Sequence, residues 1–393
     1  MPQNPWPLVL GGMAAMAAGM GIGRFIYTPI LPIMVEELGM TASQAGLIAS
    51  ANFTGHLVGA LLAASSMFAG SRYRYMLAAL AVNAVALLVM GATADFLAQL
   101  IVRFIAGVAG AFVLIFSAAL VLDRLAASGR AVLSSWHFGG VGAGIAFSAP
   151  VIAWLVGQGA DWSDLWYASA VMALAGLALS AWLIPAIDPP ATSAPAAPKS
   201  ANPLALRAMI AAYGLFGFGY VITATFIVAI VRGQPEIQAM EPYVWTLFGL
   251  SAAPTGALWM RVSERRGIFQ AYAIACVVEA VGVGASILWV SPAGVMIAVI
   301  FLGGTITGLT ALGLIAVRNL SMGDPRPNLA LATAAFGAGQ VVGPTFAGLM
   351  HDWLGSCVIP SLVAAFMLFA AAGLALAASA YRPPATSRIA PVT

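Results

Sequence analysis

The chain has 393 residues, of which 62% are hydrophobic and only 7% are charged, and its mean hydropathy is +0.97. A water-soluble domain carries roughly 25% charged residues, so this composition excludes a soluble enzyme. The 16 basic and 13 acidic residues leave a formal net charge of +3, which is too small and too dispersed for a nucleic-acid-binding surface. The composition indicates a protein that lies within a lipid bilayer.

Apolar runs between polar breaks predict twelve membrane-spanning helices. Runs of about 20 apolar residues are long enough to cross a bilayer as a helix, whereas barrel strands show a shorter, alternating pattern. The expected spans lie at residues 8–34, 43–68, 76–94, 97–122, 132–157, 165–186, 205–231, 242–261, 268–290, 294–317, 329–350 and 357–380. The expected fold class is therefore an all-α membrane protein.

One long polar segment interrupts this series. Residues 187–204 are rich in Pro, Ala and Ser and separate six spans from six, a composition typical of a mobile linker. We therefore expect an N-terminal six-helix bundle at residues 1–186 and a C-terminal bundle at residues 205–393.

The basic residues indicate the topology. If the N-terminus is cytoplasmic, 13 of the 16 basic residues lie in cytoplasmic loops or tails, and only Arg232 lies outside. Arg24 and Arg103 fall inside spans. Because positive charges are retained on the cytoplasmic side, we expect both termini to be cytoplasmic and the linker to lie on the same side.

The two halves repeat one another. Gly59 and Gly70, between the second and third spans, recur 197 residues later as Gly256 and Gly267. In spans 1 and 7 the triplets GIG and GFG are 196 residues apart. The repeat predicts two pseudo-symmetric six-helix bundles, an arrangement typical of secondary transporters that rock around a site near the bilayer midplane.

These features resemble the major facilitator superfamily over nearly the whole chain. Residues 59–75, GALLAASSMFAGSRYRY, resemble the basic loop motif of that superfamily, although the usual acidic residue before the loop is missing. RFIAG at residues 103–107 resembles its RxxxG motif, and GGVGAGIAFSAP at residues 139–150 its glycine-rich motif in span 5. GIGRFIYTPILP at residues 21–32 is similar to span 1 of a bacterial branch, the YbfB-like transporters. The resemblance implies a secondary transporter in the bacterial cytoplasmic (inner) membrane.

Arg24 and Arg103 are the most informative candidates for substrate binding. A charged guanidinium at the bilayer centre costs at least ~2.5–3.5 kcal/mol, so it needs water or a partner. The two arginines lie at similar depth in spans 1 and 4, which the resemblance implies are both cavity-lining. Because a guanidinium binds two oxygens of a carboxylate, sulfonate or phosphate at once, we expect Arg24 to be the principal ligand of a small organic anion. Arg103 is then a second ligand or an orienter; alternatively, it binds backbone and fixes span 4 against a neighbouring helix.

Other polar and aromatic residues extend this expected site. An aromatic ring can pack on the apolar body of a substrate while a hydroxyl binds its polar group. Tyr220 occupies the repeat position of Arg24. The further candidates for substrate binding are Tyr27, Asn52, Tyr213, Tyr220 and Gln340. Tyr213, Tyr220 and Gln340 are equally compatible with a packing role, whereas Tyr27 shares the helical face of Arg24.

Two titratable residues inside spans are candidates for proton coupling. His56, in span 2, can change its charge near physiological pH. Glu279, in span 9, is the one acidic residue deep within a span, and a buried carboxyl group holds its proton more readily than an exposed one. The alternative for both is a hydrogen-bonded packing residue, and the resemblance implies a peripheral place for span 9.

Glycines and loop arginines are candidates for conformational gating. Glycine allows close packing and bending of membrane helices, and Arg72 and Arg74 can bind helix ends when an inner gate closes. The expected gating residues are Gly59, Gly70, Arg72, Arg74, Gly107, Gly139, Gly140, Gly256, Gly267, Gly343 and Pro344. The arginines are alternatively topology determinants only.

The sequence contains no sign of enzymatic chemistry. Its one lysine, Lys199, follows Pro198, so a phosphate-binding loop of the GxxxxGK[ST] type cannot form. The three histidines are scattered, which argues against a metal site, and no cofactor is expected. Energy must then come from an ion gradient.

The first interpretation is a proton-coupled carrier of a small organic anion, working as a monomer with protons and the bilayer as its partners. The alternative is a proton-coupled multidrug or lipophilic-cation efflux antiporter, in which Glu279 is the counter-charge. A third is a non-transporting sensor or scaffold on the same fold.

Overall fold

The computed structural model describes residues 4–68, 70–130, 133–186, 203–322 and 325–380. Over these residues the chain is helical, without strands. The first half consists of α1 (Trp6–Met16), the π-helix η1 (Ala17–Ile22), α2 (Tyr27–Leu38), α3 (Ala42–Ala63), the 3-10 helix η2 (Ser66–Phe68), α4 (Arg72–Ala92), α5 (Phe96–Ala127), α6 (Ser134–Gly157) and α7 (Trp162–Leu183). The second half consists of α8 (Pro203–Arg232), the 3-10 helix η4 (Gln238–Met240), α9 (Glu241–Ala252), α10 (Thr255–Arg266), α11 (Ile268–Leu288), α12 (Pro292–Leu320), α13 (Arg326–Leu354) and α14 (Val358–Ala380).

Eleven segments of the described chain are long and apolar enough to cross a membrane. The first of them, Trp6–Leu38, combines α1, η1 and α2. The eighth expected span, residues 242–261, is instead two helices of 12 residues each, α9 and α10. They part at Pro254, whose ring removes a backbone donor and interrupts the helix. Twelve crossings are thus confirmed, whereas the prediction of a continuous eighth helix is wrong.

Several boundaries differ from the expected ones. The second span ends at Ala63 rather than at residue 68, and the fourth continues to Ala127. Residues 187–202 of the expected linker lie outside the described residues, and α8 begins at Pro203. Side-chain caps set several starts, such as Thr41, which forms a capping box with Gln44 at the start of α3.

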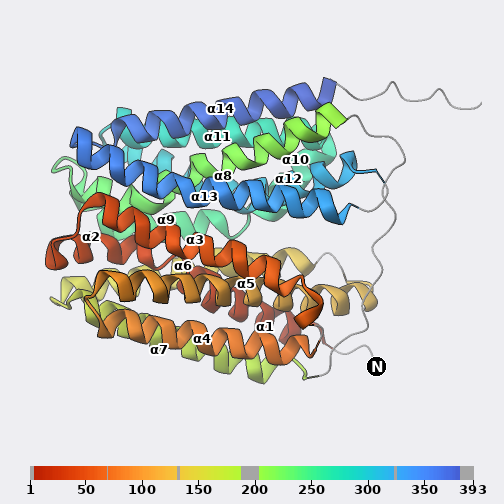
Figure 1. Cartoon of the computed structure of the whole chain (residues 1–393), viewed down its shortest axis with the longest axis horizontal. Coiled ribbons are helices and arrows are strands. Elements are labelled where there is room, and N and C mark those ends of the chain that lie inside the picture. The colour runs from red at the N-terminus through yellow and green to blue at the C-terminus, as the bar shows by residue number, and fades with distance from the viewer. Residues whose placement is uncertain (1–3, 69, 131–132, 187–202, 323–324, 381–393) are drawn as a thin grey trace, which may run out of the picture.

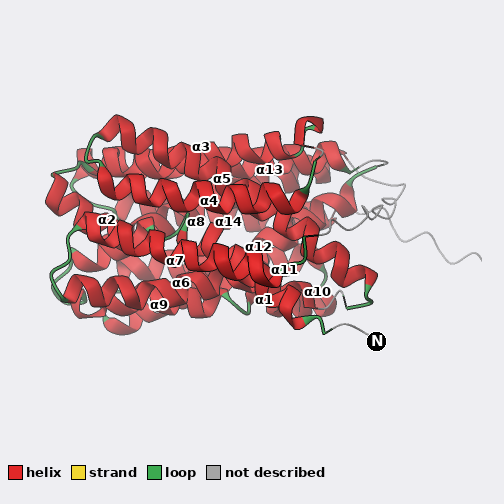
Figure 2. Ribbon diagram, turned by 90° about the horizontal axis from the view of Figure 1, so that it is seen from below, coloured by secondary structure: helices red, strands yellow, loops and turns green. Residues whose placement is uncertain are grey.

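The helices form two bundles that lie side by side along the long axis of the molecule (Figure 1). Figure 2 shows that helices make up almost all of the described chain and that loops join them at the two ends. We call the end where α1 begins and α14 ends the tail end, and the opposite end, where α2 ends, the far end. Gly39 and Gly355, both at positive φ, close α2 and α13 at the far end.

Two equivalent helix pairs join the halves. The first is α3 with α13, that is spans 2 and 11, and the second is α6 with α9, that is spans 5 and 8. Both pairs are close because glycine faces backbone: a methyl group on Gly46 would collide with the carbonyl of Pro344, and one on Gly142 with the backbone of Ala253. The same contact thus occurs twice, as a two-fold repeat requires.

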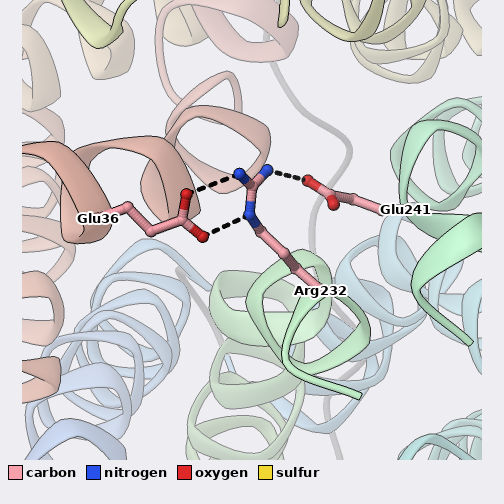
Figure 3. A network of polar contacts seen from close by, with 3 residues as sticks. All are labelled: Glu36, Arg232 and Glu241. Atoms are coloured by element: carbon pink, nitrogen blue, oxygen red, sulfur yellow. Dashed lines mark hydrogen bonds and ion pairs between the residues drawn. The ribbon is translucent and has the colours of Figure 1, made fainter. Parts of the chain in front are cut away.

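Spans 1 and 7 meet along the pseudo-two-fold axis. The Thr28 hydroxyl donates to the Ala224 carbonyl at 2.9 Å, and these residues are 196 positions apart. Arg232, at the end of α8, binds the Glu36 carboxylate with two nitrogens at 2.6 and 2.7 Å, again across 196 positions. Arg232 also binds Glu241 of its own half at 2.8 Å (Figure 3).

A second polar contact joins the halves at the far end. The Asp352 carboxylate, near the end of α13, accepts hydrogen bonds from the backbone N–H groups of Ala42 and Ser43 at 3.0 and 3.1 Å. It caps the N-terminus of α3, where backbone donors are free and a negative charge is favoured. In this conformation the far ends of the two halves are tied together by charge.

Candidate functional site

The first span is interrupted in the middle of the molecule. Its η1 segment is a π-helix in which the Gly23 N–H donates to the Ala18 carbonyl at 2.9 Å, and residues 23–26 form a turn before α2 begins. The sequence favours such a break because Pro29 has no backbone N–H to donate to the carbonyl of Phe25. That carbonyl accepts from Thr28 instead, at 3.3 Å. Arg24 lies within the turn.

Arg103 of α5 binds the interrupted backbone. Its Nη1 donates to the Gly23 carbonyl and its Nη2 to the Arg24 carbonyl, each at 3.2 Å. Asn52 of α3 in turn donates to the Arg103 carbonyl at 3.1 Å. These bonds correspond to the backbone-binding alternative for Arg103, and its role as a second substrate ligand stays a prediction.

Arg24 has the opposite environment. Its side chain is 6% exposed, and its Nε and Nη2 have no hydrogen-bond partner among the described residues. Its guanidinium lies 4.5 Å from the ring centre of Phe53 and 5.4 Å from that of Phe25. These aromatic faces stabilise a cation in part, but they supply no counter-charge and accept no strong hydrogen bond.

A cavity of about 10 Å³ lies beside Arg24, which is about the room that one water molecule needs. Its lining comes from span 1, α3, α5 and α8 and consists of Arg24, Phe25, Tyr27, Thr28, Ala49, Phe53, Arg103, Val221, Ala224 and Thr225. Both halves therefore contribute to it. In this conformation the cavity is too small for any molecule much larger than water.

Tyr220 and Gln340 approach the site from the second half. The Gln340 amide nitrogen donates to the Tyr220 hydroxyl, and both side chains are buried. The positive charge of Arg24 acts on the Tyr220 hydroxyl. Arg24 and Tyr220 occupy equivalent positions in the repeat. The Tyr220 ring stacks on Phe216, with ring centres 5.1 Å apart.

Tyr213 lies on α8, seven residues before Tyr220. Its ring stacks on Phe336 at 4.8 Å, and its hydroxyl donates to the Thr310 carbonyl at 3.4 Å. It is fully buried against its own half, so the structure groups it with the aromatic core and not with the residues around the cavity.

Tyr27 packs at the break itself. Its hydroxyl donates to the Ala45 carbonyl of α3 at 2.9 Å, and its ring stacks on Trp166 of α7 at 6.4 Å. The Arg103 guanidinium lies 5.0 Å from the Tyr27 ring centre. Tyr27 thus lines the cavity with its ring while its hydroxyl is already bonded.

The two proton-coupling candidates lie in different places. His56 of α3 is half-buried, within electrostatic range of Arg24, and its Nδ1 has no hydrogen-bond partner among the described residues. Glu279 of α11 is fully buried, and neither carboxylate oxygen has such a partner. Because α11 packs mainly on α12 and α14, Glu279 lies inside the second half.

The expected gating glycines fall into two groups. Those at close helix contacts are Gly59, Gly107, Gly139, Gly140 and Gly343, where an added methyl group would meet backbone or side-chain atoms of another helix. Gly107, for example, faces the Asn52 carbonyl, so that α3 and α5 approach closely. Pro344 offers its carbonyl to Gly46 across the halves.

Of the remaining gating candidates, Gly256 lies at the start of α10, inside span 8, and the other four lie at the tail end, between α10 and α11 or around the start of α4. Gly256 has open space around it, Gly267 has φ +86° between α10 and α11, and Gly70 lies against the Tyr75 hydroxyl. Arg72 pairs with Asp123 of α5 at 2.7 Å, within its own half, and Arg74 is exposed.

Sequence reasoning missed one residue at the break and one ion pair. Asn83 of α4 is 1% exposed and donates to the Gly19 carbonyl of η1 at 3.0 Å. A lone Asn inside an otherwise apolar span was the available signal. The sequence assigns Arg232 to topology alone; its separation from Glu36 by the repeat length, with opposite charges, was the available signal for the ion pair.

Fold and site together define a membrane transporter: two six-helix halves meet at a buried, positively charged site that both of them line. This is the architecture of a secondary transporter of the major facilitator superfamily. Over residues 16–376 the chain belongs to the family described as "Uncharacterised MFS-type transporter YbfB".

Solved structures support the same fold. The nucleoside transporter NupG is similar with a TM-score of 0.72 at 15% identity, covering 96% of this chain and 99% of that one. The structure of a mutant of NupG is similar with a TM-score of 0.68 at 14% identity, covering 95% and 99%. No curated protein sequence matches the chain.

Proposed function

We propose that this transporter carries a small organic anion by proton-coupled alternating access. The observation that carries the proposal is Arg24, whose Nε and Nη2 are buried without a partner among the described residues, beside a cavity between the halves. Leaving buried polar groups unpaired is costly, more so when they are charged. An oxyanion bound at Arg24 supplies both the missing charge and the missing acceptors.

The neighbouring residues then take different roles. Arg24 is the principal ligand, and Arg103 orients it by holding the carbonyls of Gly23 and Arg24. Tyr220 and Gln340 contribute polar groups from the second half, next to the aromatic stack that can cover the apolar body of the substrate. Asn52 binds the Arg103 carbonyl, Tyr27 lines the cavity, and Tyr213 belongs to the aromatic stack with Phe216 and Phe336.

Alternating access in this proposal moves residues 1–186 against residues 205–393. The far ends are tied by Arg232–Glu36 and by Asp352 on α3, which supports a conformation closed on that side. The distribution of basic residues assigns the tail end, with both termini, to the cytoplasm of a bacterial inner membrane.

The coupling proton is assigned to His56. The positive charge of Arg24 acts on His56, so a protonated His56 is repelled by this cation until an anion binds. Anion and proton therefore favour each other, which produces symport. Glu279 is the other candidate carrier, buried within the second half.

The alternative, export of lipophilic cations, requires an acidic group on the pathway. Glu279 is fully buried on α11, which packs mainly on α12 and α14. Arg24 and Arg103 line the cavity instead and repel a cation. This distribution of charge favours the anion.

The test is the thermal stability of the purified protein with carboxylates, sulfonates, phosphonates, nucleosides and lipophilic cations. A ligand at a hundredfold excess over its Kd stabilises the native state by about 2.7 kcal/mol. We expect an anion to stabilise the wild type, Arg24→Ala to abolish the shift, and Arg24→Lys to retain a small part of it, because lysine keeps the charge but lacks the planar fork.

Arg74→Ala is the matched control, because Arg74 is exposed at the tail end, and it should respond like the wild type. Stabilisation by cations alone, removed by Glu279→Gln, would replace the anion proposal with the antiporter. Stabilisation by nucleosides that survives Arg24→Ala would also contradict it.

The proton assignment predicts a pH dependence. Anion affinity should rise as the pH falls, since protonated His56 is better tolerated when the anion is bound. In His56→Gln the affinity should be lower and nearly independent of pH between 5 and 8. Titrations of anion binding at several pH values check this, and an unchanged pH profile in His56→Gln would move the assignment to Glu279.

A further inference from the structure

Asn83 lies on a helix that otherwise faces away from the site. Its helix, α4, packs mainly on α5 and α7, and several of its apolar side chains are exposed, such as Val82 and Val85. The Asn83 side chain is nevertheless 1% exposed and reaches η1, where its Nδ2 donates to the Gly19 carbonyl at 3.0 Å. A peripheral helix thus contacts the interrupted part of span 1.

The side-chain amide of Asn83 occupies the space that a side chain on Gly23 would need. A methyl group on Gly23 would collide with the Asn83 amide, at 2.6 Å from its Cγ. The Asn83 Oδ1 is buried without a partner among the described residues. Asn83 therefore binds the chain just before the break, while Arg103 binds Gly23 and Arg24 at the break itself.

The break separates two parts of span 1 that pack on different partners. Before it, α1 and η1 lie against α6, α7 and α5 of their own half, whereas α2 lies mainly against α8 of the other half. Arg24 is at the junction, and α2 continues from there to Glu36, the partner of Arg232. A junction of this kind needs to be held in place if Arg24 is to keep its direction.

We propose that Asn83 is a positioning residue for Arg24: together with Arg103 it holds the broken segment of span 1 so that the Arg24 guanidinium points into the cavity between the halves. This inference rests on the proposed function, because it concerns the same anion site. It adds a residue, from α4, that does not line the cavity.

The first experiment tests the contact between Gly23 and Asn83 without any ligand. Gly23→Ala should lower the Tm by several degrees, and adding Asn83→Ala should restore part of the loss, since the colliding amide is gone. Gly21→Ala is the matched control: its methyl group would lie 2.7 Å from the Val141 carbonyl and 2.9 Å from the Gly144 Cα of α6, so Asn83→Ala should not restore it. If the Tm loss of the double variant equals the sum of the losses of Gly23→Ala and Asn83→Ala, the inference is overturned.

The second experiment tests positioning through anion affinity. Asn83→Ala should weaken the binding of the stabilising anion about tenfold, which corresponds to about 1.4 kcal/mol. Ser169→Ala is the control for buried hydrogen bonds that are only structural, because Ser169 donates within α7 to the Leu165 carbonyl. It should lower the Tm and leave the anion affinity unchanged.

The outcomes separate the two proposals. Wild-type anion affinity in Asn83→Ala overturns the positioning role even when the anion site itself is real. A wild type that no anion stabilises contradicts the proposed function, and the Gly23–Asn83 pair of variants still decides whether Asn83 holds the break.

Discussion

Arg24 and Arg103 are both buried arginines inside membrane-spanning segments, yet their surroundings differ. Two nitrogens of Arg103 are bonded to carbonyls that the break in span 1 has released. Arg24 projects from that same break, and two of its nitrogens have no partner among the described residues. Because a guanidinium does not lose its charge in a protein, Arg24 is a buried cation that still lacks hydrogen-bond acceptors, which is why the proposed anion site is centred on it.

At the same scale, two glycines in equivalent repeat positions should respond differently to alanine. A methyl group on Gly59 would lie 2.7 Å from the Val108 backbone, whereas Gly256 has nothing within 4 Å. Gly59→Ala should destabilise the protein by about 1–3 kcal/mol through overpacking. Gly256→Ala should stabilise it by about 0.5–1 kcal/mol, because alanine is the better helix former. Thermal unfolding of both variants checks this, and equal effects would show that α3 and α5 are not in close contact.

Among the elements, the interrupted helices are the most consequential. Span 1 divides into α1, which packs on its own half, and α2, which packs on α8. Span 8 divides at Pro254 into α9, which packs on α6 and α12, and α10. Each interruption falls in a span that touches the opposite half, so local bending is available at the contacts between the halves.

The contact between α13 and α3 leads to a prediction for one element pair. Asp352 caps α3 across the halves, whereas Asp161 caps its own helix through the N–H of Asp164 at 2.9 Å. Both Asp352→Ala and Asp161→Ala should lose about 1 kcal/mol of stability. A cysteine introduced by Thr225→Cys reports access to the cavity, in a protein whose Cys276 and Cys357 are replaced by alanine. Only Asp352→Ala should also raise the rate at which this cysteine is labelled. Equal labelling rates in the two variants would contradict a gating role for the α13–α3 contact.

For the whole molecule, the pseudo-two-fold axis explains why an ion pair joins the halves at the far end. Glu36 and Arg232 occupy equivalent positions in the two halves and carry opposite charges, so the axis brings them together. Thr28 and Ala224 meet in the same way nearer to the site. The single basic residue expected on the far side is therefore the one that ties the halves.

Reversing this pair should preserve the closed far end. The variants are made in a Glu241→Gln background, because Arg232→Glu would otherwise place a carboxylate beside that of Glu241. In this background, Glu36→Arg alone should raise the labelling rate of Thr225→Cys up to about fivefold. That corresponds to the loss of an ion pair worth ~1 kcal/mol. Adding Arg232→Glu should bring the rate back towards that of Glu241→Gln. High salt should narrow the difference, and a double variant that labels as fast as Glu36→Arg would contradict the tie.

Much of the architecture can be read from the chain before any contact is known. A bilayer offers no hydrogen bonds to the backbone, so long apolar runs must be helices. The concentration of basic residues in alternate loops supports the number of these helices. The repeat distance of 196 residues matches Tyr220 to Arg24, and it also relates Thr28 to Ala224 and Glu36 to Arg232. The apolar runs and the repeat depend on local composition and on comparison of the chain with itself, and neither needs a folded molecule.

The interruption of span 1, the partners of Arg103 and the involvement of Asn83 depend on packing instead. The carbonyls that Arg103 binds are 79 and 80 residues away, and they are free only because the backbone of span 1 departs from an α-helix there. Asn83 meets Gly23 only once α4 and η1 lie together. Hydropathy records how well each residue suits the bilayer, whereas the pairing of buried polar groups is decided between helices, where each unpaired group must find its partner in space.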